Sequence, residues 1–320
     1  MELRGIKFKK VWCASGVQGF FGEGYWFHQP LKPFGLDFAG ATFVAKTTTL
    51  LENKGNMELN PDFTPRELLP DCIWAPPWKD YALNAIALSG PGARALFERY
   101  EWQKRTKPFF ISFMSIEDTP EKRLEELRCF LNVLNIYVHE LEDFRAPVGL
   151  QINYSCPSVG LHLDALLREV SDALDTASRA RIPLMPKFNL LIPVEAARDI
   201  SRHPACDGIC MSNTIPFNQL PKDMRRKLFG FAPSPLAKYG GGGLSGGPLL
   251  PFLLAWLTKA RRVGLEKPIN GGGGILSLGD AKAVLYAGAD SIFLGSIAFK
   301  RPWRVRHIIH TLQNGDSGGA

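Results

Sequence analysis

A cysteine and an asparagine follow an apolar run in residues 147–160, PVGLQINYSCPSVG. The alternating apolar residues of Val148–Ile152 are typical of a buried strand, and Pro157 ends the strand because it has no N–H to donate to a neighbour. Asn153 and Cys156 therefore fall at or just past the C-terminal end of a strand, where α/β proteins hold catalytic groups. A thiol there can act as a base, although a single cysteine more often serves as a small buried apolar residue.

Other polar side chains end further strand-like runs, namely Ser15, Lys46, Lys187 and Asn213. A lysine that ends an apolar strand, as in PLMPKFN around Lys187, needs an anion or an electron-rich ring nearby unless its amine reaches solvent. One such lysine alone would be weak evidence for a ligand site. Because Lys46 and Lys187 stand on separate strands, together they indicate a shared site.

Eight strand-like runs alternate with helix-like runs, which is the pattern of a parallel α/β fold. The helix-like runs carry clear signals, such as Thr119-Pro120 as an N-cap followed by proline at the first helical position. We predict a single (β/α)8 TIM barrel over residues 1–313 and a flexible tail over 314–320. The predicted strands are Val11–Ala14, Thr42–Ala45, Phe109–Met114, Val148–Asn153, Leu184–Lys187, Gly208–Ser212, Pro268–Gly271 and Ser291–Leu294.

Two connections are too long to be simple turns, at about residues 50–88 and 214–247. Both follow strands, so both should lie at the C-terminal face of the barrel, where they can cover a site. The last two strands end in glycines, Gly271–Gly274 and Gly295-Ser296. Glycine lets backbone N–H groups approach a phosphate, and these two loops are the usual phosphate site of this barrel. The sequence thus predicts a cofactor that carries a phosphate.

Composition sets wider limits on the protein class. The 320 residues are 45% hydrophobic and carry a net charge of +7. No run is apolar enough to span a membrane, and MELRGIKFKK lacks the apolar core of a signal peptide, so we expect a cytoplasmic protein. The charge permits an anionic ligand or nucleic acid, but the short Lys/Arg clusters are more typical of a solvated face, and we expect no nucleic acid partner.

The cysteines and histidines predict neither disulfides nor metal. The six cysteines are scattered and contain no CxxC pair. Cys206 and Cys210, four residues apart on an apparent strand, should point to the same face as packing residues. His307 and His310 have HxxH spacing, but no third ligand is nearby, so we expect no metal site.

An ordered set of short motifs resembles the dihydroorotate dehydrogenase family. They span the chain from about Ser15 to Ser296. The motifs are AKTTTL at 45–50, SCP at 155–157, SNTI at 212–215, GGLSG at 242–246 and GGI at 273–275.

The resemblance implies an FMN-dependent TIM barrel that oxidises dihydroorotate to orotate in pyrimidine biosynthesis, here as a homodimer. It makes Cys156 the base, as in the class without a membrane segment, and Lys187 would stabilise negative charge on the reduced flavin. The implied flavin contacts are Ser15, Gly16, Lys46, Thr47, Asn153, Lys187, Ser212, Gly246, Gly273, Gly274, Gly295 and Ser296. The implied substrate contacts are Lys46, Asn84, Ala85, Ile86, Ala87, Leu88, Asn153, Asn213 and Thr214.

Departures from the family pattern fall in the substrate half. Ser158 replaces the asparagine of the usual SCPN, and Ala87 replaces a glycine. Gln151 replaces the glutamate of the usual ELN, which reads QIN here. Three alternatives therefore stay open: a dihydropyrimidine dehydrogenase-like enzyme, a dihydrouridine synthase, and a flavin-binding barrel without turnover. The second usually carries GCP and an added helical domain, and the sequence has neither. The electron acceptor is also open between fumarate, a quinone, and NAD reached through an iron–sulfur partner subunit.

Overall fold

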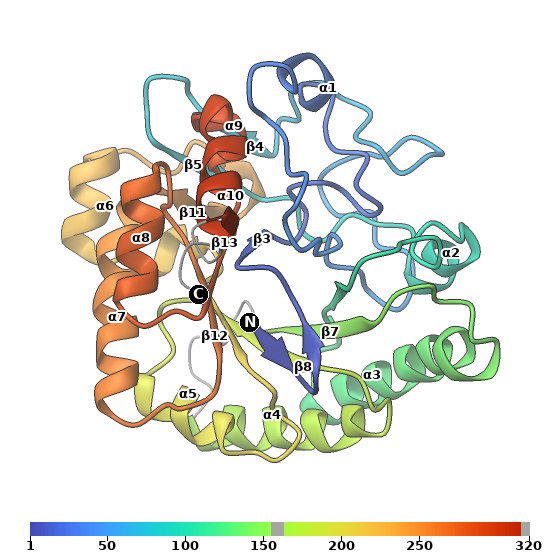
Figure 1. Cartoon of the computed structure of the whole chain (residues 1–320). Helices are drawn as coiled ribbons and strands as arrows, with labels where there is room; N and C mark the ends of the chain where they lie inside the picture. Colours follow the sequence, from blue (N-terminus) through green and yellow to red (C-terminus); the bar gives the residue numbers. More distant parts are fainter. Residues whose placement is uncertain (155–162, 315–320) are drawn as a thin grey trace.

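The computed structural model describes residues 1–154 and 163–314. Within them, seven strands form one parallel sheet in the order β3-β13-β12-β9-β8-β7-β6, at the centre of Figure 1. This order follows the chain around a curled sheet, as a βα repeat requires. The strands are β3 (Val11–Cys13), β6 (Phe109–Phe113), β7 (Val148–Tyr154), β8 (Leu184–Phe188), β9 (Ile209–Met211), β12 (Ile269–Gly272) and β13 (Ser291–Leu294).

Residues 42–48 close the sheet into a TIM barrel. They lie between β3 and β6, bridged in parallel to both through Trp12–Thr42 and Val44–Phe110. The Cys13 N–H donates to Thr42 O (2.8 Å), and the Ala45 N–H donates to Phe110 O (2.9 Å). The predicted strand at 42–45 is therefore in place, but it is a run of single bridges, because the next N–H, of Lys46, turns away to Gly19 O (2.9 Å).

Large side chains fill the barrel interior and close its N-terminal end. Trp12, Phe110 and Phe293 pack there with Met185 and Cys210. The ring centroids of Trp12 and Phe110 are 4.9 Å apart. A short hairpin of β1 (Glu2–Leu3) and β2 (Ile6–Lys7) covers this end with Leu3 and Phe8. The polar residues predicted for a functional site lie at the opposite end, where the strands finish.

Helices surround the barrel on the outside (Figure 1). The Thr119 hydroxyl caps α3 by accepting from the Lys122 N–H (3.3 Å), as the Thr-Pro signal predicts. The helices are α1 (His28–Leu31), α2 (Ala93–Glu98), α3 (Pro120–Asn135), α4 (Leu163–Ser178), α5 (Val194–Ser201), α6 (Lys222–Phe229), α7 (Leu250–Arg262), α8 (Leu278–Tyr286), α9 (Ile297–Lys300) and α10 (Val305–Asn314).

The two long connections build a second sheet that the sequence did not predict. It is antiparallel, in the order β10-β11-β5-β4, and joins β4 (Ile73–Trp74) and β5 (Tyr81–Asn84) to β10 (Ile215–Pro216) and β11 (Gly243–Gly246). Tyr81, Leu83 and Leu244 form part of its own apolar core. These strands are too short to show the alternation of apolar and polar residues from which a strand is predicted.

Two further sequence predictions meet the structure with different results. Cys206 and Cys210 are both buried, but they do not share a strand face, because β9 begins only at Ile209. Cys206 packs in the main core outside the barrel and Cys210 inside it, so the same-face prediction is wrong. Asn314, the first residue of the predicted tail, still belongs to α10, and residues 315–320 lie outside the described part of the chain.

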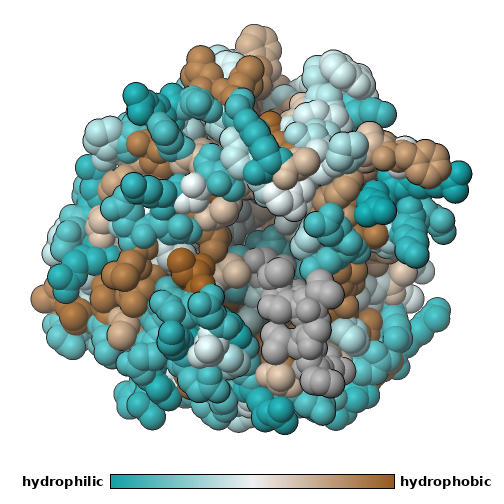
Figure 2. Space-filling model, turned by 180° about the vertical axis from the view of Figure 1, so that it is seen from behind, coloured by the Kyte–Doolittle hydropathy of each residue, from teal (hydrophilic) through white to brown (hydrophobic). Residues whose placement is uncertain are grey.

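The surface has a mixed character. On the face opposite to that of Figure 1, hydrophobic residues form separate patches among hydrophilic ones (Figure 2). Across residues 1–154 and 163–314, no helix combines the length and the apolar character that crossing a membrane requires.

Candidate active site

A string of hydrogen-bonded polar side chains crosses the C-terminal end of the barrel. The Ser15 and Thr47 hydroxyls are 2.9 Å apart, and Asn153 Nδ2 donates to Thr47 Oγ1 at 3.4 Å. Asn213 Nδ2 in turn donates to Asn153 Oδ1 (3.0 Å). Four of the predicted site residues, which come from four different strand ends, are thus brought into one contiguous group.

Ser112 of β6 belongs to the same group, and sequence analysis missed it. Its hydroxyl lies 2.9 Å from Thr47 Oγ1, and its side chain is fully buried. The available signal was a single hydroxyl inside the otherwise apolar strand FFISF. A buried hydroxyl is retained where it has a hydrogen-bond partner, and here Thr47 provides one.

Lys46 joins the barrel end to the loop at residues 84–89. Its ammonium donates to Ser89 O and lies 4.6 Å from the centroid of the Phe20 ring. Burial lowers the pKa of Lys46 to about 8, because the charged amine loses its water. In the described residues no carboxylate forms an ion pair with this amine, so it remains available to a bound anion.

Side-chain amides hold the same loop, which carries the predicted substrate residues. Asn53 Nδ2 donates to Ala87 O (2.8 Å), and Asn56 Nδ2 donates to Ala85 O (2.7 Å). Ala87 and Leu88 have φ values of 55° and 60°, in the left-handed region that favours glycine. Ala87, which replaces the family's glycine, therefore sits in a strained backbone.

Asn84 and Thr214 meet across one glycine of the second sheet. Gly243 of β11 pairs with Asn84 of β5. A Cβ on Gly243 would lie 2.4 Å from Thr214 Oγ1, so only glycine fits between the two chains. The Thr214 N–H also donates to Asn213 Oδ1 (2.8 Å), which connects this corner to the polar string.

Lys187 of β8 is a buried cation at the barrel's centre. It lies in register with Asn153 of β7 and Cys210 of β9, and its amine is 5.9 Å from the centroid of the Phe293 ring. Burial lowers the pKa of Lys187. No carboxylate among the described residues pairs with it. A buried amine without such a partner is suited to an electron-rich or anionic group of a ligand.

The glycine loops after β9, β11 and β12 form a second group. A Cβ on Gly273 would lie 2.7 Å from Ser212 Oγ, and one on Gly274 would lie 2.9 Å from Gly246 O. Both glycines have positive φ, at 120° and 83°. Only glycine allows the backbone of these segments to approach so closely, and glycine turns of this kind can direct backbone N–H groups at a phosphate.

The remaining predicted flavin contacts lie next to the polar string. A Cβ on Gly295 would lie 3.1 Å from the Ala14 Cβ, beside Ser15, and Ser296 precedes α9. A Cβ on Gly16 would lie 3.6 Å from Lys46 Cγ. Tyr25, another residue that sequence analysis missed, donates its hydroxyl to Gly16 O (3.2 Å). Burial raises the pKa of Tyr25 to about 12, so it stays a neutral donor.

Cys156 and Ser158 lie outside the described residues. The chain is described up to Tyr154 at the end of β7 and again from α4 onward. Arg123 of α3 holds α4, the flank on the C-terminal side. Its guanidinium makes a two-pronged ion pair with Glu169 of α4, with N···O distances of 2.6 and 2.7 Å.

Comparisons with known proteins agree on one family. A family model described as dihydroorotate dehydrogenase matches residues 1–315. Dihydroorotate dehydrogenase A (fumarate) of Lactobacillus helveticus is 26% identical over 98% of this chain and 91% of its own length. The catalytic subunit of dihydroorotate dehydrogenase B (NAD(+)) of Thermotoga petrophila is 28% identical over 88% of this chain and 91% of its own.

A solved structure supports the fold. The dihydroorotate dehydrogenase of Eimeria tenella, solved in complex with ferulenol, aligns with a TM-score of 0.67. It covers 99% of this chain and 85% of its own length at 18% identity. At this identity the likeness supports the fold alone, and the function of the site must be inferred from the residues of this chain.

Proposed function

The chain belongs to the dihydroorotate dehydrogenase family, whose members are oxidoreductases acting on CH–CH bonds, and we propose that it uses FMN to oxidise dihydroorotate to orotate in pyrimidine biosynthesis. The observation that carries this proposal is the polar string across the barrel end, flanked by two buried lysines without a carboxylate partner in the described residues. Uncharged hydrogen-bonding groups beside buried cations suit a flat, anionic, hydrogen-bonding ligand.

The residues present fit FMN. Gly273, Gly274 and Gly246 supply the close backbone that a phosphate needs, and Ser212 lies beside them. Lys187 offers its buried ammonium to the electron-rich part of the isoalloxazine ring. When bound, FMN supplies the two-electron acceptor for the hydride that leaves the substrate.

Dihydroorotate presents a carboxylate and an imide edge, and the second group of residues suits both. Lys46 provides a positive charge next to the loop at 84–89. Asn153 and Asn213 each carry an amide with a donor and an acceptor, which matches the alternating groups of an imide. Their present bond to each other (3.0 Å) would be exchanged for bonds to the substrate.

We assign the proton transfer to Cys156. As thiolate, its sulfur takes the proton from the carbon next to the substrate carbonyl while the neighbouring C–H bond gives up its hydride. Lys187 stabilises the negative charge that results at the centre of the site. This assignment rests on the SCP motif, which lies outside the described residues.

The proposal also includes the electron acceptor, the oligomeric state and the cellular location of the enzyme. Its relatives are named for fumarate and for NAD(+) as acceptor, so both must be tried, the second with an iron–sulfur partner subunit. We further propose a homodimer in the cytoplasm. Light scattering of the purified protein measures the oligomeric state.

Anaerobic flavin reduction tests the function directly. The purified protein should be yellow, release FMN on denaturation, and bleach when dihydroorotate is added. Dihydrouracil serves as the matched control because it lacks the carboxylate. Bleaching by dihydrouracil alone would assign the protein to the dihydropyrimidine dehydrogenase-like alternative, and a protein that takes up no FMN would refute the proposal as a whole.

A further inference from the structure

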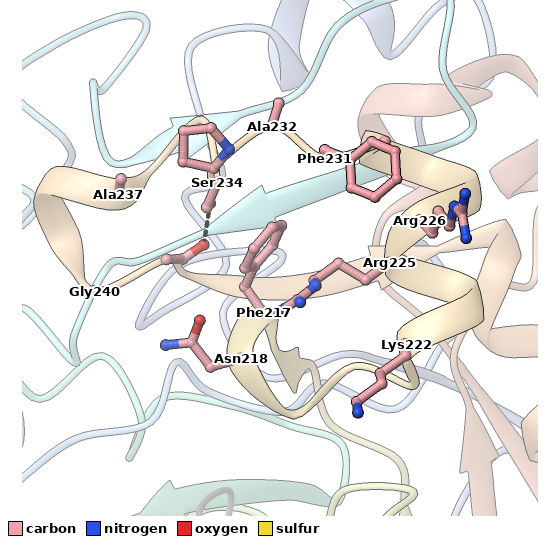
Figure 3. Close-up of a pocket in the computed structure, with 13 residues that line it drawn as sticks. Phe217, Asn218, Lys222, Arg225, Arg226, Phe231, Ala232, Ser234, Ala237 and Gly240 are labelled. Carbon is pink, nitrogen blue, oxygen red and sulfur yellow. Dashed lines mark hydrogen bonds between the residues drawn. The ribbon is translucent and has the colours of Figure 1, made fainter.

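A cavity of about 650 Å³ opens between α6 and residues 230–241, on the long connection after β9. Figure 3 shows its lining, with Phe217 at the centre and α6 at one side. The Phe217 N–H donates to Gly242 O (2.8 Å), and Ser234 Oγ donates to Gly241 O (2.6 Å). These bonds hold Phe217 and Ser234 of the lining against the segment at 241–242. The cavity shares no residue with the candidate active site.

One face of α6 gives the cavity a positive charge. Lys222, Arg225 and Arg226 all line it, and their spacing of three and four residues places them on the same side of a helix. Lys227, one residue further, does not line it. Among the described residues, no carboxylate forms an ion pair with any of the three lining cations.

Two aromatic rings stand beside these cations. Arg226 lies 4.8 Å from the centroid of Phe231, and Arg225 lies 5.9 Å from that of Phe217. Phe231 is 88% exposed, although a phenyl ring gains most when it is buried. An exposed ring at the rim of a cationic cavity offers a stacking surface to a flat ligand.

The size of the cavity decides between small and large ligands. Small-molecule sites enclose roughly 300–1,000 Å³, whereas protein partners usually meet broader surfaces. Guanidinium groups bind phosphate oxygens in a two-pronged manner, and phenyl rings stack on bases. Both chemistries occur together in a nucleotide.

We propose that this cavity is a binding site for a nucleoside diphosphate or a similar aromatic phosphate. Arg225 and Arg226 hold the phosphates, Lys222 adds charge, and Phe231 covers the base. The site is separate from the flavin cradle, so it does not depend on the proposed function.

Fluorescence titration with mant-ADP tests the proposal. The FMN-loaded protein is first freed of unbound flavin, and orotate is present throughout, so that the probe cannot enter the candidate active site. We expect saturable binding that weakens as salt rises, because exposed charges are screened. Unlabelled ADP and UDP should displace the probe, whereas adenosine, without phosphates, should do so at least ~10-fold less well.

Paired variants locate the probe. Arg225→Gln with Arg226→Gln should weaken binding ~10-fold or more, since charge-assisted bonds to phosphate are lost. Phe231→Ala should weaken it several-fold. Lys227→Gln, on the same helix but outside the cavity, should leave it unchanged. No saturable binding, or an equal loss in Lys227→Gln and the double variant, would overturn the assignment. If the protein binds no FMN, the difference between the double variant and Lys227→Gln still shows whether the probe binds in this cavity.

Discussion

Replacing Lys46 with methionine should stabilise the ligand-free protein while it damages the site. Lys46 carries a buried ammonium whose described contacts are Ser89 O and the Phe20 ring. Methionine has a similar length and fills the same apolar channel without a charge. The variant therefore separates the cost of holding the cation from its use.

The magnitude follows from the pKa of Lys46, which burial lowers from 10.5 to about 8. That difference corresponds to ~3 kcal/mol of penalty on the folded state at pH 7. The variant removes this penalty but also loses the hydrogen bond to Ser89 O, which costs ~1–2 kcal/mol. The unfolding free energy should therefore increase by ~1–2 kcal/mol.

The gain should depend on pH in one direction only. Between about pH 8 and 10.5 the folded protein has released the Lys46 proton and the unfolded chain still holds it. The unfolded state then binds more protons, so the stability of the native protein rises with pH through this window. The advantage of Lys46→Met is thus full below pH 8 and reaches zero within this window, where the remaining penalty equals the ~1–2 kcal/mol of the lost bond.

Urea unfolding of flavin-free protein at pH 7 and pH 10 measures this. Lys107→Met, at an exposed lysine, is the control and should change the unfolding free energy by less than ~0.5 kcal/mol. In FMN-loaded protein, Lys46→Met should bind orotate ~10- to 100-fold more weakly. A variant less stable than native at pH 7, or equally stabilised at both pH values, would refute the reasoning.

Three further changes test other parts of the site. Cys156→Ala should retain FMN but slow its reduction by dihydroorotate ~10²-fold or more, and Cys156→Ser should keep some activity shifted to higher pH; an unchanged rate in the alanine variant would return the cysteine to a packing role. Ser158→Asn should tighten orotate binding ~10-fold or more if one contact is missing, and weaker binding in calorimetry would show a differently arranged site. Ala87→Gly should raise the unfolding free energy by ~0.5–1 kcal/mol because φ is 55°, and a loss in urea unfolding would contradict the strain.

The barrel and its strand-end residues were predictable from the sequence. Apolar runs that end in polar residues indicate strands, and pairing of these strands brings Ser15, Asn153 and Asn213 into one hydrogen-bonded group through Thr47. Proline and capping signals placed the start of α3 correctly. Such features are local, so a short window of sequence contains them.

What the sequence did not predict depends on contacts between distant segments. The second sheet pairs Gly243 with Asn84, 159 positions earlier, through strands too short to show a period. Ser112 looks like part of a buried strand until Thr47 is placed beside it. The expected same face for Cys206 and Cys210 failed because spacing alone cannot tell where β9 begins.

Two of the departures from the family pattern have different settings, because Gln151 is paired on both sides within β7 whereas Ala87 lies in the loop at 85–89. Several residues that we assign to the cofactor follow directly after strands such as β12, which is paired with a neighbour on both sides. The loop at 85–89 is held by separate single bonds, which come from the side chains of Asn53, Asn56 and Lys46 and from the Asn56 N–H to Ile86 O. A loop held in this way can absorb Ala87 at the expense of local strain, because no ladder runs through it. Substrate choice can therefore change in this family while the barrel end that we assign to FMN stays as it is.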